Sequence, residues 1–302
     1  MIVFVAEKEE IHQAALHNLK DHNFSIYFQD KFEKIRGKVD VLFIKTYTKA
    51  DKAYLANFPN LKFLLRAGVG LDNVDREECE RRKIKIFNSP GSNTNSVAEF
   101  VLMLILMLLR KVQYQSLKMS EGEWRDKKMI GEELKDKTLG LVGCGEIGSL
   151  VAEKLSFLGV KKILGFDPYL DRETLLKRNT EKEELKDILE KADIISLHLP
   201  LNKQTKGIIG LKEISFMKRT SYLINTSRGG IVNEKDLIIA LKKKLIMGAA
   251  LDVFENEPKV KKGFFSLKNI VLTPHIAAFT EEANKQMSIQ AVENFLNEVI
   301  SK

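Results

Sequence analysis

Short apolar runs rich in β-branched residues alternate with amphipathic stretches along the first 90 or so residues. The runs at 2–5, 41–44, 62–65 and 84–87 are typical of buried strands, and the stretches between them have helical spacing. A further helix is predicted from about residue 93 to residue 111. Because its surface is apolar all round, we expect it to be buried between other elements. The first 90 or so residues, before this helix, are predicted to form an α/β unit.

The same alternation restarts after Thr138. Strands are predicted at 139–142, 163–166, 194–197, 222–225, 247–251 and 270–272, with helices between them such as 147–158 and 233–244. Six strands joined by helices indicate a parallel sheet covered on both faces. The last stretch, 281–300, is predicted to be a long helix that could pack back on the first unit.

Composition narrows the class of protein. The chain has 302 residues, 44% of them apolar and 30% charged, which favours a globular protein of about two domains. Its longest apolar run, Phe100 to Leu109, is ten residues, whereas a bilayer span needs about 20. The first residues also lack the pattern of a secretory signal. We therefore expect no membrane association and a cytoplasmic location.

Charge and cysteine content exclude further classes. The 49 basic and 41 acidic residues are interleaved, so the net charge of +8 favours a solvated surface or a small anionic substrate over a nucleic-acid partner. Cys79 and Cys144 lie far apart and form no Cys-x-x-Cys motif. Neither a disulfide framework nor a metal site is expected, and both thiols are predicted to be reduced.

A glycine-rich motif, Gly143-Cys-Gly-Glu-Ile-Gly148, follows a predicted strand and opens a predicted helix. Glycines there permit a tight turn and the close approach of a pyrophosphate to the amino end of the helix. Asp167, at the end of the next strand, is placed to bond ribose hydroxyls and to repel a 2′-phosphate, which favours NAD over NADP. The alternative is a tight strand-to-helix turn that binds no ligand.

Four further polar residues follow predicted strands of the same sheet: His198, Arg228, Glu257 and His275. Parallel strands bring their carboxyl ends to one edge, where ligands bind. An arginine presents a planar fork to a carboxylate, and a glutamate beside an imidazole favours the protonated form that a general acid needs. The alternatives are a packing role for His198 and surface ion pairing for Arg228 and Glu257.

At this point the chain resembles a known family, the D-isomer-specific 2-hydroxyacid dehydrogenases. The resemblance covers essentially the whole chain and is carried by six motifs: Arg66 to Asp75, Asn88 to Phe100, the glycine motif with Asp167, Asn225 to Gly230, Gly248 to Pro258 and Thr273 to Ala277. It implies an α/β fold of two Rossmann-like domains with parallel sheets, a flavodoxin-like substrate domain plus an NAD-binding domain. The implied boundaries are 1–92 with 277–302 for the discontinuous substrate or lid domain, and 93–276 for the NAD-binding domain, with the active site between them.

The resemblance also implies roles for residues. Arg228, Glu257 and His275 match the catalytic triad of the family. Cofactor-binding roles are implied for Gly143, Gly145, Glu146, Ile147, Gly148, Asp167, His198, Leu199, Pro200, Thr205, Thr226, Ser227, Asp252 and Ala277, and substrate-binding roles for Lys45, Gly68, Val69, Gly70 and Asn93. A homodimer formed through the region from Phe100 to Lys137 is expected.

Within the family, the segment that begins at Arg66 is most like that of D-3-phosphoglycerate dehydrogenases. The implied reaction is the NAD-dependent interconversion of 3-phosphoglycerate and 3-phosphohydroxypyruvate, in serine biosynthesis. Lys45 stands where those enzymes generally carry a phosphate-contacting arginine, and Asp126 stands at an expected basic position. The chain ends at Lys302, so no regulatory domain is expected. The alternatives are a hydroxypyruvate or glyoxylate reductase and, from another class, an NADH-sensing corepressor-like protein.

Overall fold

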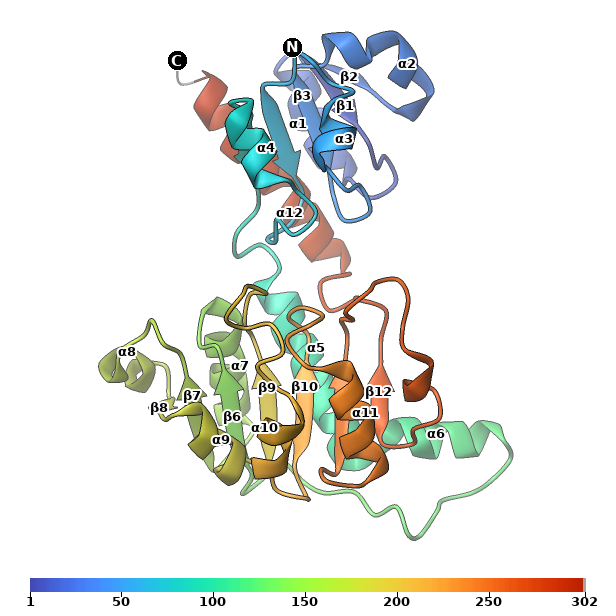
Figure 1. Ribbon diagram of the computed structural model, residues 1–302, viewed down its shortest axis with the longest axis vertical. Coiled ribbons are helices and arrows are strands. Elements are labelled where there is room, and N and C mark those ends of the chain that lie inside the picture. The colour runs from blue at the N-terminus through green and yellow to red at the C-terminus, as the bar shows by residue number, and fades with distance from the viewer. Residues whose placement is uncertain (301–302) are drawn as a thin grey trace. The chain divides into compact units, whose positions relative to one another are not determined.

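The structure, a computed structural model, describes residues 1–300 and forms two compact units (Figure 1). The first unit comprises Met1–Asn93 and the segment from Ala278 onward, and the second comprises Thr94–Ala277. Each limit lies one residue from the predicted domain boundary. Residues 301–302 of the predicted first domain lie outside the described residues.

A five-stranded parallel sheet forms the centre of the first unit, in the order β2-β1-β3-β4-β5. The inner strands β1 and β3 are almost entirely buried, which explains their continuous apolar sequence. The strands are β1 (Ile2–Val5), β2 (Ser25–Tyr27), β3 (Val41–Ile44), β4 (Phe63–Arg66) and β5 (Lys85–Phe87).

Helices cover both faces of this sheet. One face packs against α1 and α12, and the other against α2, α3 and α4. The helices are α1 (Gln13–Asp21), α2 (Phe32–Ile35), α3 (Lys52–Leu55), α4 (Arg76–Arg81) and α12 (Glu281–Ile300). The predicted return of the last helix to the first unit is thus observed, with Phe295 buried against Phe24 and Phe63.

A seven-stranded parallel sheet forms the centre of the second unit, in the order β12-β11-β10-β9-β6-β7-β8. The chain order reverses between β6 and β9, which is the point where open parallel sheets bind ligands at their carboxyl edge. The strands are β6 (Thr138–Val142), β7 (Lys162–Phe166), β8 (Glu181–Lys182), β9 (Ile194–Leu197), β10 (Tyr222–Asn225), β11 (Gly248–Leu251) and β12 (Ile270–Leu272).

Helices again cover both faces, with α9, α10 and α11 in front of the sheet in Figure 1 and α5 behind it. The second unit contains α5 (Thr94–Arg110), α6 (Val112–Ser120), α7 (Glu146–Phe157), α8 (Arg172–Lys177), α9 (Leu185–Lys191), α10 (Leu211–Phe216) and α11 (Glu234–Lys242). Helix α5 buries seven side chains against the strands and α7. Met103 and Leu106 of the same helix are 40% and 42% exposed, so the predicted burial of its whole apolar surface is only partly correct.

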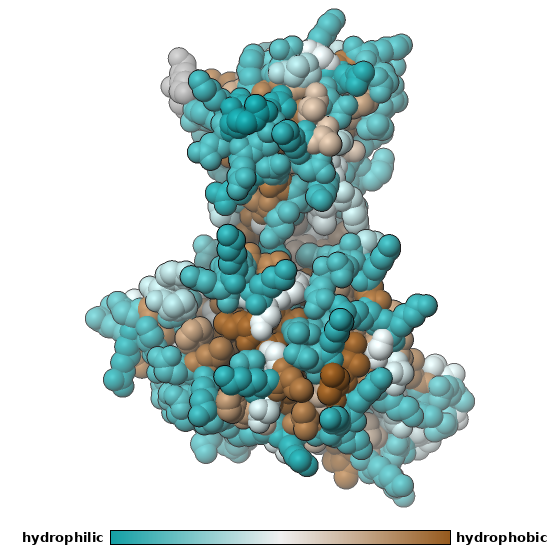
Figure 2. Space-filling view, viewed as in Figure 1, coloured by the Kyte–Doolittle hydropathy of each residue, from teal (hydrophilic) through white to brown (hydrophobic). Residues whose placement is uncertain are grey.

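Two strands, β2 and β8, were not predicted from the sequence. β2 has no fully buried residue and β8 is a two-residue edge strand, so neither carries a continuous apolar run. Among residues 1–300, no helix is long and apolar enough to cross a membrane. Figure 2 shows hydrophilic side chains over most of the visible face, with hydrophobic ones gathering mainly on the second unit.

Candidate active site

His275 and Glu257 form a hydrogen-bonded pair in the second unit. The His275 Nδ1 atom lies 2.7 Å from Glu257 Oε2, although the residues are 18 positions apart. Burial alone would raise the pKa of Glu257, but the hydrogen bonds from His275 and from the Phe254 N–H, together with nearby positive charge, lower it. The carboxylate therefore accepts the Nδ1 hydrogen, which leaves Nε2 of a 40% exposed imidazole for proton transfer.

A fully buried aspartate holds the turn that carries His275. Asp252 Oδ1 accepts hydrogen bonds from Thr273 Oγ1 at 2.6 Å and the Ile276 N–H at 2.9 Å, and Oδ2 accepts the Ala277 N–H at 2.8 Å. His275 itself has φ +56°, a left-handed conformation that a non-glycine residue adopts only when its surroundings fix it. Both carboxylate oxygens of Asp252 thus serve the turn, and its predicted contact with the cofactor stays a prediction.

Arg228 lies in a tight turn after β10. Asn225, at the end of that strand, accepts hydrogen bonds from the N–H and hydroxyl of Ser227, and its amide donates to the Arg228 carbonyl at 3.0 Å. A side chain at Gly229 would place its Cβ 1.9 Å from the Phe254 carbonyl oxygen. Only glycine permits this backbone contact, which brings the Arg228 turn against the segment that ends at Glu257.

The glycine-rich turn has the geometry that a dinucleotide requires. A Cβ at Gly143 would lie 2.5 Å from the His198 carbonyl oxygen, and one at Gly148 would lie 2.3 Å from the Gly143 carbonyl oxygen. A Cβ at Gly145, in contrast, would meet no protein atom within 4 Å. The outer two glycines thus permit close packing, and the middle one leaves open space at the amino end of α7.

Asp167 is held beside this turn. Its Oδ2 accepts the Cys144 N–H at 2.9 Å and its Oδ1 accepts the Tyr169 N–H at 2.9 Å, which leaves further lone pairs on a half-buried carboxylate. Burial raises the pKa of the Cys144 thiol to about 12, so this cysteine is a neutral, buried side chain of the turn.

Two buried polar atoms of the predicted cofactor set, Thr226 Oγ1 and His198 Nε2, have no hydrogen-bond partner among the described residues. Burial lowers the pKa of His198 to about 4, which keeps the imidazole neutral. Buried polar atoms are normally paired, so orphaned ones favour a ligand that completes them. Together with the open turn at Gly145, they fit a bound dinucleotide.

The remaining residues of the predicted cofactor set lie in loops and helix ends of the second unit. Thr205 donates to the Pro200 carbonyl at 2.6 Å and so fixes the loop that follows β9. The neighbouring Leu199 is buried, and Glu146 and Ile147 form the first turn of α7.

The predicted substrate-binding glycines belong to the first unit. Gly68 and Gly70 follow β4, and the carbonyls of Gly68 and Val69 accept hydrogen bonds from the Ser89 N–H and the Asn88 amide. Gly68 has φ +149°, and a Cβ built on it would fall 1.4 Å from Arg66 Nη1. The segment is thus fixed with a guanidinium beside it. Asn93, the last residue of the first unit, directly precedes α5.

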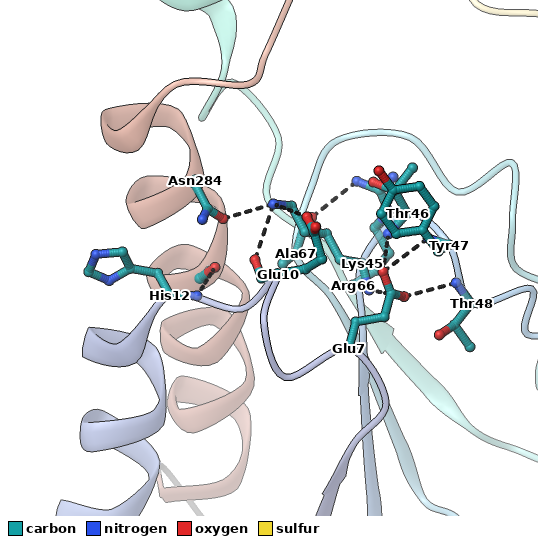
Figure 3. A network of polar contacts seen from close by, with 11 residues as sticks. Glu7, Glu10, His12, Lys45, Thr46, Tyr47, Thr48, Arg66, Ala67 and Asn284 are labelled. Carbon is teal, nitrogen blue, oxygen red and sulfur yellow. Dashed lines mark hydrogen bonds and ion pairs between the residues drawn. The ribbon is translucent and has the colours of Figure 1, made fainter. Parts of the chain in front are cut away.

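Lys45 is placed differently from the prediction. Its side chain is 6% exposed, and Nζ donates to the Glu10 carbonyl at 3.1 Å, to Glu10 Oε2 at 3.2 Å and to Asn284 Oδ1 at 2.9 Å. Figure 3 shows this ammonium between the loop that joins β1 to α1, which carries Glu10, and α12. Because an ammonium has three hydrogens to donate, these internal acceptors use all of them. The arrangement argues against Lys45 as a phosphate ligand.

The loop around Lys45 is fixed by a second carboxylate. Glu7 accepts the backbone N–H groups of residues 45–48 at distances of 2.9–3.0 Å (Figure 3). Burial would raise the pKa of Glu7, but these hydrogen bonds outweigh burial and lower it. Asn73 binds the Lys45 and Thr48 carbonyls at 2.8 Å from the other side. This loop is therefore built as a rigid part of the first unit.

A stability measurement tests the structural role of Lys45. We expect Lys45→Met to lower the free energy of unfolding by about 2–4 kcal/mol, because the Glu10 carbonyl, the Glu10 carboxylate and Asn284 Oδ1 lose the donor that they share. Urea unfolding measures this loss. Lys62→Met is the matched control, since Lys62 is 63% exposed in its ion pair with Asp40, and it should cost less than about 1 kcal/mol. Equal losses in the two variants would contradict the structural role.

Sequence reasoning missed several residues that build the site. Asn225 shapes the Arg228 turn, and Arg178 donates from one nitrogen to the Cys144 carbonyl at 2.8 Å and to Ser149 Oγ at 2.9 Å, so it braces the glycine-rich turn. A polar side chain at the end of an apolar strand was the available signal for Asn225. Nothing in the local sequence around Arg178 distinguishes it from a surface cation.

Residues 102–277 match the family model described as the NAD-binding domain of D-isomer-specific 2-hydroxyacid dehydrogenases, so the cofactor of the second unit is NAD. The chain is 37% identical to a hydroxypyruvate reductase of Thermotoga maritima over 274 residues, which cover 90% of this chain and 88% of that protein.

The chain is also similar to proteins with other activities. The chain is 38% identical to a D-3-phosphoglycerate dehydrogenase of Methanocaldococcus jannaschii over 258 residues, which are 85% of this chain and about half (49%) of that protein. Among solved structures, a D-lactate dehydrogenase of Aquifex aeolicus complexed with NAD and lactic acid matches with a TM-score of 0.85 at 27% identity, covering 100% of this chain and 96% of that one.

Proposed function

The chain belongs to the D-isomer-specific 2-hydroxyacid dehydrogenase family, whose members are NAD-dependent, and we propose that it reduces a short, unphosphorylated 2-oxoacid of the hydroxypyruvate or glyoxylate class. The observation that carries this choice of substrate is the placement of Lys45. The one lysine that stands at the expected phosphate position is buried and donates all its hydrogens internally.

The geometry of the second unit supports the following mechanism. NADH, when bound, supplies the hydride that reduces the carbonyl carbon C2. The Arg228 guanidinium binds the substrate carboxylate and polarises the carbonyl. His275 donates the proton on Nε2 to the forming alkoxide, and Glu257 keeps the imidazole oriented and stabilises its protonated form. In the oxidative direction neutral His275 accepts the hydroxyl proton.

Substrate binding by the first unit is part of this proposal. Gly68, Val69 and Gly70 are proposed to bind the substrate carboxylate through the backbone, and Asn93 to contact the substrate. Their support is the rigid, glycine-dependent segment after β4. That the first unit binds the substrate and the second binds the cofactor and carries the catalytic residues is part of the same proposal.

The second candidate substrate is 3-phosphohydroxypyruvate, the substrate of the predicted phosphoglycerate dehydrogenase of serine biosynthesis. One observation favours it, because the Arg66 guanidinium lies beside Gly68 and supplies positive charge there. A third possibility is an NADH-sensing corepressor-like protein. Such a protein would have the same fold and triad, but no turnover of a 2-oxoacid would be observed.

Steady-state kinetics separate these functions. NADH oxidation is measured with glyoxylate, hydroxypyruvate and 3-phosphohydroxypyruvate under the same conditions. We expect kcat/KM for hydroxypyruvate or glyoxylate to exceed that for the phosphorylated compound by at least tenfold, about 1.4 kcal/mol. The reverse order would establish the phosphoglycerate assignment, and NADH binding without turnover of any 2-oxoacid would favour the sensor.

The pH profile tests Glu257. Because its carboxylate stabilises protonated His275, Glu257→Gln should lower the pKa of His275 and move the alkaline limb of the reductive profile to lower pH, by about one unit. Glu190→Gln, an exposed carboxylate on α9, should leave the limb in place. An alkaline limb that is unmoved in Glu257→Gln would remove Glu257 from the mechanism.

A homodimer through the region from Phe100 to Lys137 also belongs to the proposal. Its support is a group of exposed apolar side chains there: Met119 at 58%, Trp124 at 78% and Ile130 at 77%. We expect Trp124→Asp to shift the mass measured by light scattering toward the monomer. The control is Tyr169→Ser, which removes an aromatic ring that is 84% exposed elsewhere on the same unit and should leave the mass unchanged. A monomeric parent protein would contradict the proposal.

A further inference from the structure

A buried carboxylate outside the proposed catalytic residues joins α11 to the segment that carries Glu257. Glu234, the first residue of α11, is 3% exposed. Its Oε1 accepts the Glu255 N–H at 2.6 Å, and its own N–H donates to Glu255 Oε1 at 3.2 Å. Two residues 21 positions apart therefore hold each other through reciprocal hydrogen bonds.

Lys261 completes this cluster. Its Nζ lies 2.9 Å from Glu234 Oε2 and also donates to Glu255 Oε2. Burial opposes the charge of Lys261, but its hydrogen bonds to Glu255 and Glu234 outweigh burial and raise its pKa. A buried carboxylate without a partner is costly, and Lys261 supplies the positive charge that pairs with Glu234 in the interior. We call Glu234, Glu255 and Lys261 the α11 clamp.

The α11 clamp adjoins the backbone that orients the catalytic pair. Glu255 follows Phe254, whose N–H donates to Glu257 Oε1 at 2.9 Å, while Glu257 Oε2 binds His275. The Phe254 carbonyl is the group that packs against Gly229, next to Arg228. The clamp therefore fixes the stretch of chain on which the placement of both Glu257 and the Arg228 turn depends.

We propose that Glu234 and Lys261 are positioning residues of the reaction, which act through residues 254–257 to hold the Glu257 carboxylate against His275. The inference rests on the proposed role of His275 as proton donor. Its physical basis is that a carboxylate orients an imidazole effectively only within hydrogen-bond distance, and that small displacements of catalytic groups cost large factors in rate.

The test measures the pKa of His275 by NMR titration of the histidine-labelled full-length protein, with the signal assigned by its loss in His275→Gln. Among the described residues, the titratable and charged groups that interact with this imidazole include Glu257 and Asp252, and Arg228 lies near Glu257. We expect both Glu234→Gln and Lys261→Met to lower the pKa of His275 by about half a unit or more, because each lets Glu257 move away from the ring.

Lys261→Met is the decisive variant. A simple field effect predicts opposite signs for the two changes, since removing a positive charge raises the pKa of a histidine and removing a negative charge lowers it. Lys262→Met, which removes a neighbouring exposed lysine that forms no ion pair with any residue from 1 to 300, should leave the pKa unchanged. In a Glu257→Gln background, Lys261→Met should cause no further fall.

The outcomes are distinct. A His275 pKa that rises or stays constant in Lys261→Met would overturn the proposal, as would a further fall in the Glu257→Gln background. If Glu234→Gln fails to fold, Lys261→Met alone decides. The titration needs no substrate, so failure of the parent protein to reduce any 2-oxoacid would overturn the proposed function without touching this result. Where the parent is active, kcat should fall severalfold in both variants with the Kd for NADH unchanged.

Discussion

Replacing His275 by alanine is expected to lower kcat for 2-oxoacid reduction by about 100-fold or more, equivalent to about 2.7 kcal/mol of transition-state stabilisation. The reason is that Nε2 of His275 is the proposed proton donor, and the loss of its imidazole leaves the alkoxide without one. NADH binding should be unaffected, because the glycine-rich turn and Asp167 lie on other loops of the second unit. Turnover and a fluorescence titration of NADH measure the two halves separately.

The control for this prediction is His22→Ala, which removes an exposed histidine at the end of α1 in the first unit. It should leave kcat unchanged. Retention of more than about a tenth of the parent kcat in His275→Ala would remove His275 from the role of general acid. A parallel loss of NADH binding would instead indicate a local collapse of the turn that Asp252 holds.

The choice of cofactor gives the second large effect. Asp167 is fixed beside the glycine-rich turn by two backbone N–H groups, and its remaining lone pairs suit a ribose diol while its charge opposes a 2′-phosphate. We expect kcat/KM to favour NADH over NADPH by at least tenfold, about 1.4 kcal/mol. Asp167→Ser should narrow this preference by removing the charge.

Steady-state kinetics with both cofactors check this expectation. Asp187→Ser removes a carboxylate from the surface of α9 and serves as the control, with no expected change in preference. Equal use of NADH and NADPH by the parent protein would contradict the role of Asp167. An unchanged preference in Asp167→Ser would assign the discrimination to another group.

The fold was predictable because its strands are buried on both faces. Runs such as 41–44 and 194–197 contain only residues that the structure buries, so the sequence displays them without interruption. The meeting of the motifs at the carboxyl ends of these strands was also predictable, because a parallel sheet brings those ends to one edge. β2 and β8 lie at the edges of their sheets, where burial is incomplete and the pattern fades.

The site was predictable only as far as residue type indicates chemistry. The pairing of Glu257 with His275 follows from their types and from the topology. The internal hydrogen bonds of Lys45 could not be predicted in this way, because they depend on Glu10 and on Asn284, which lies 239 positions away. The same holds for Glu234, whose partners Glu255 and Lys261 look like surface charges in the sequence. Side chains that act through long-range contacts leave no local signal.

A transfer experiment with deuterated NADH tests the central claim most directly. The protein is incubated with hydroxypyruvate and NADH that carries deuterium on the transferred position of the nicotinamide, and the product is analysed by NMR and by chiral chromatography. The account predicts a D-2-hydroxyacid with deuterium at C2, formed at least 100-fold more slowly by His275→Ala. An L-product, or a product without deuterium at C2, would contradict it.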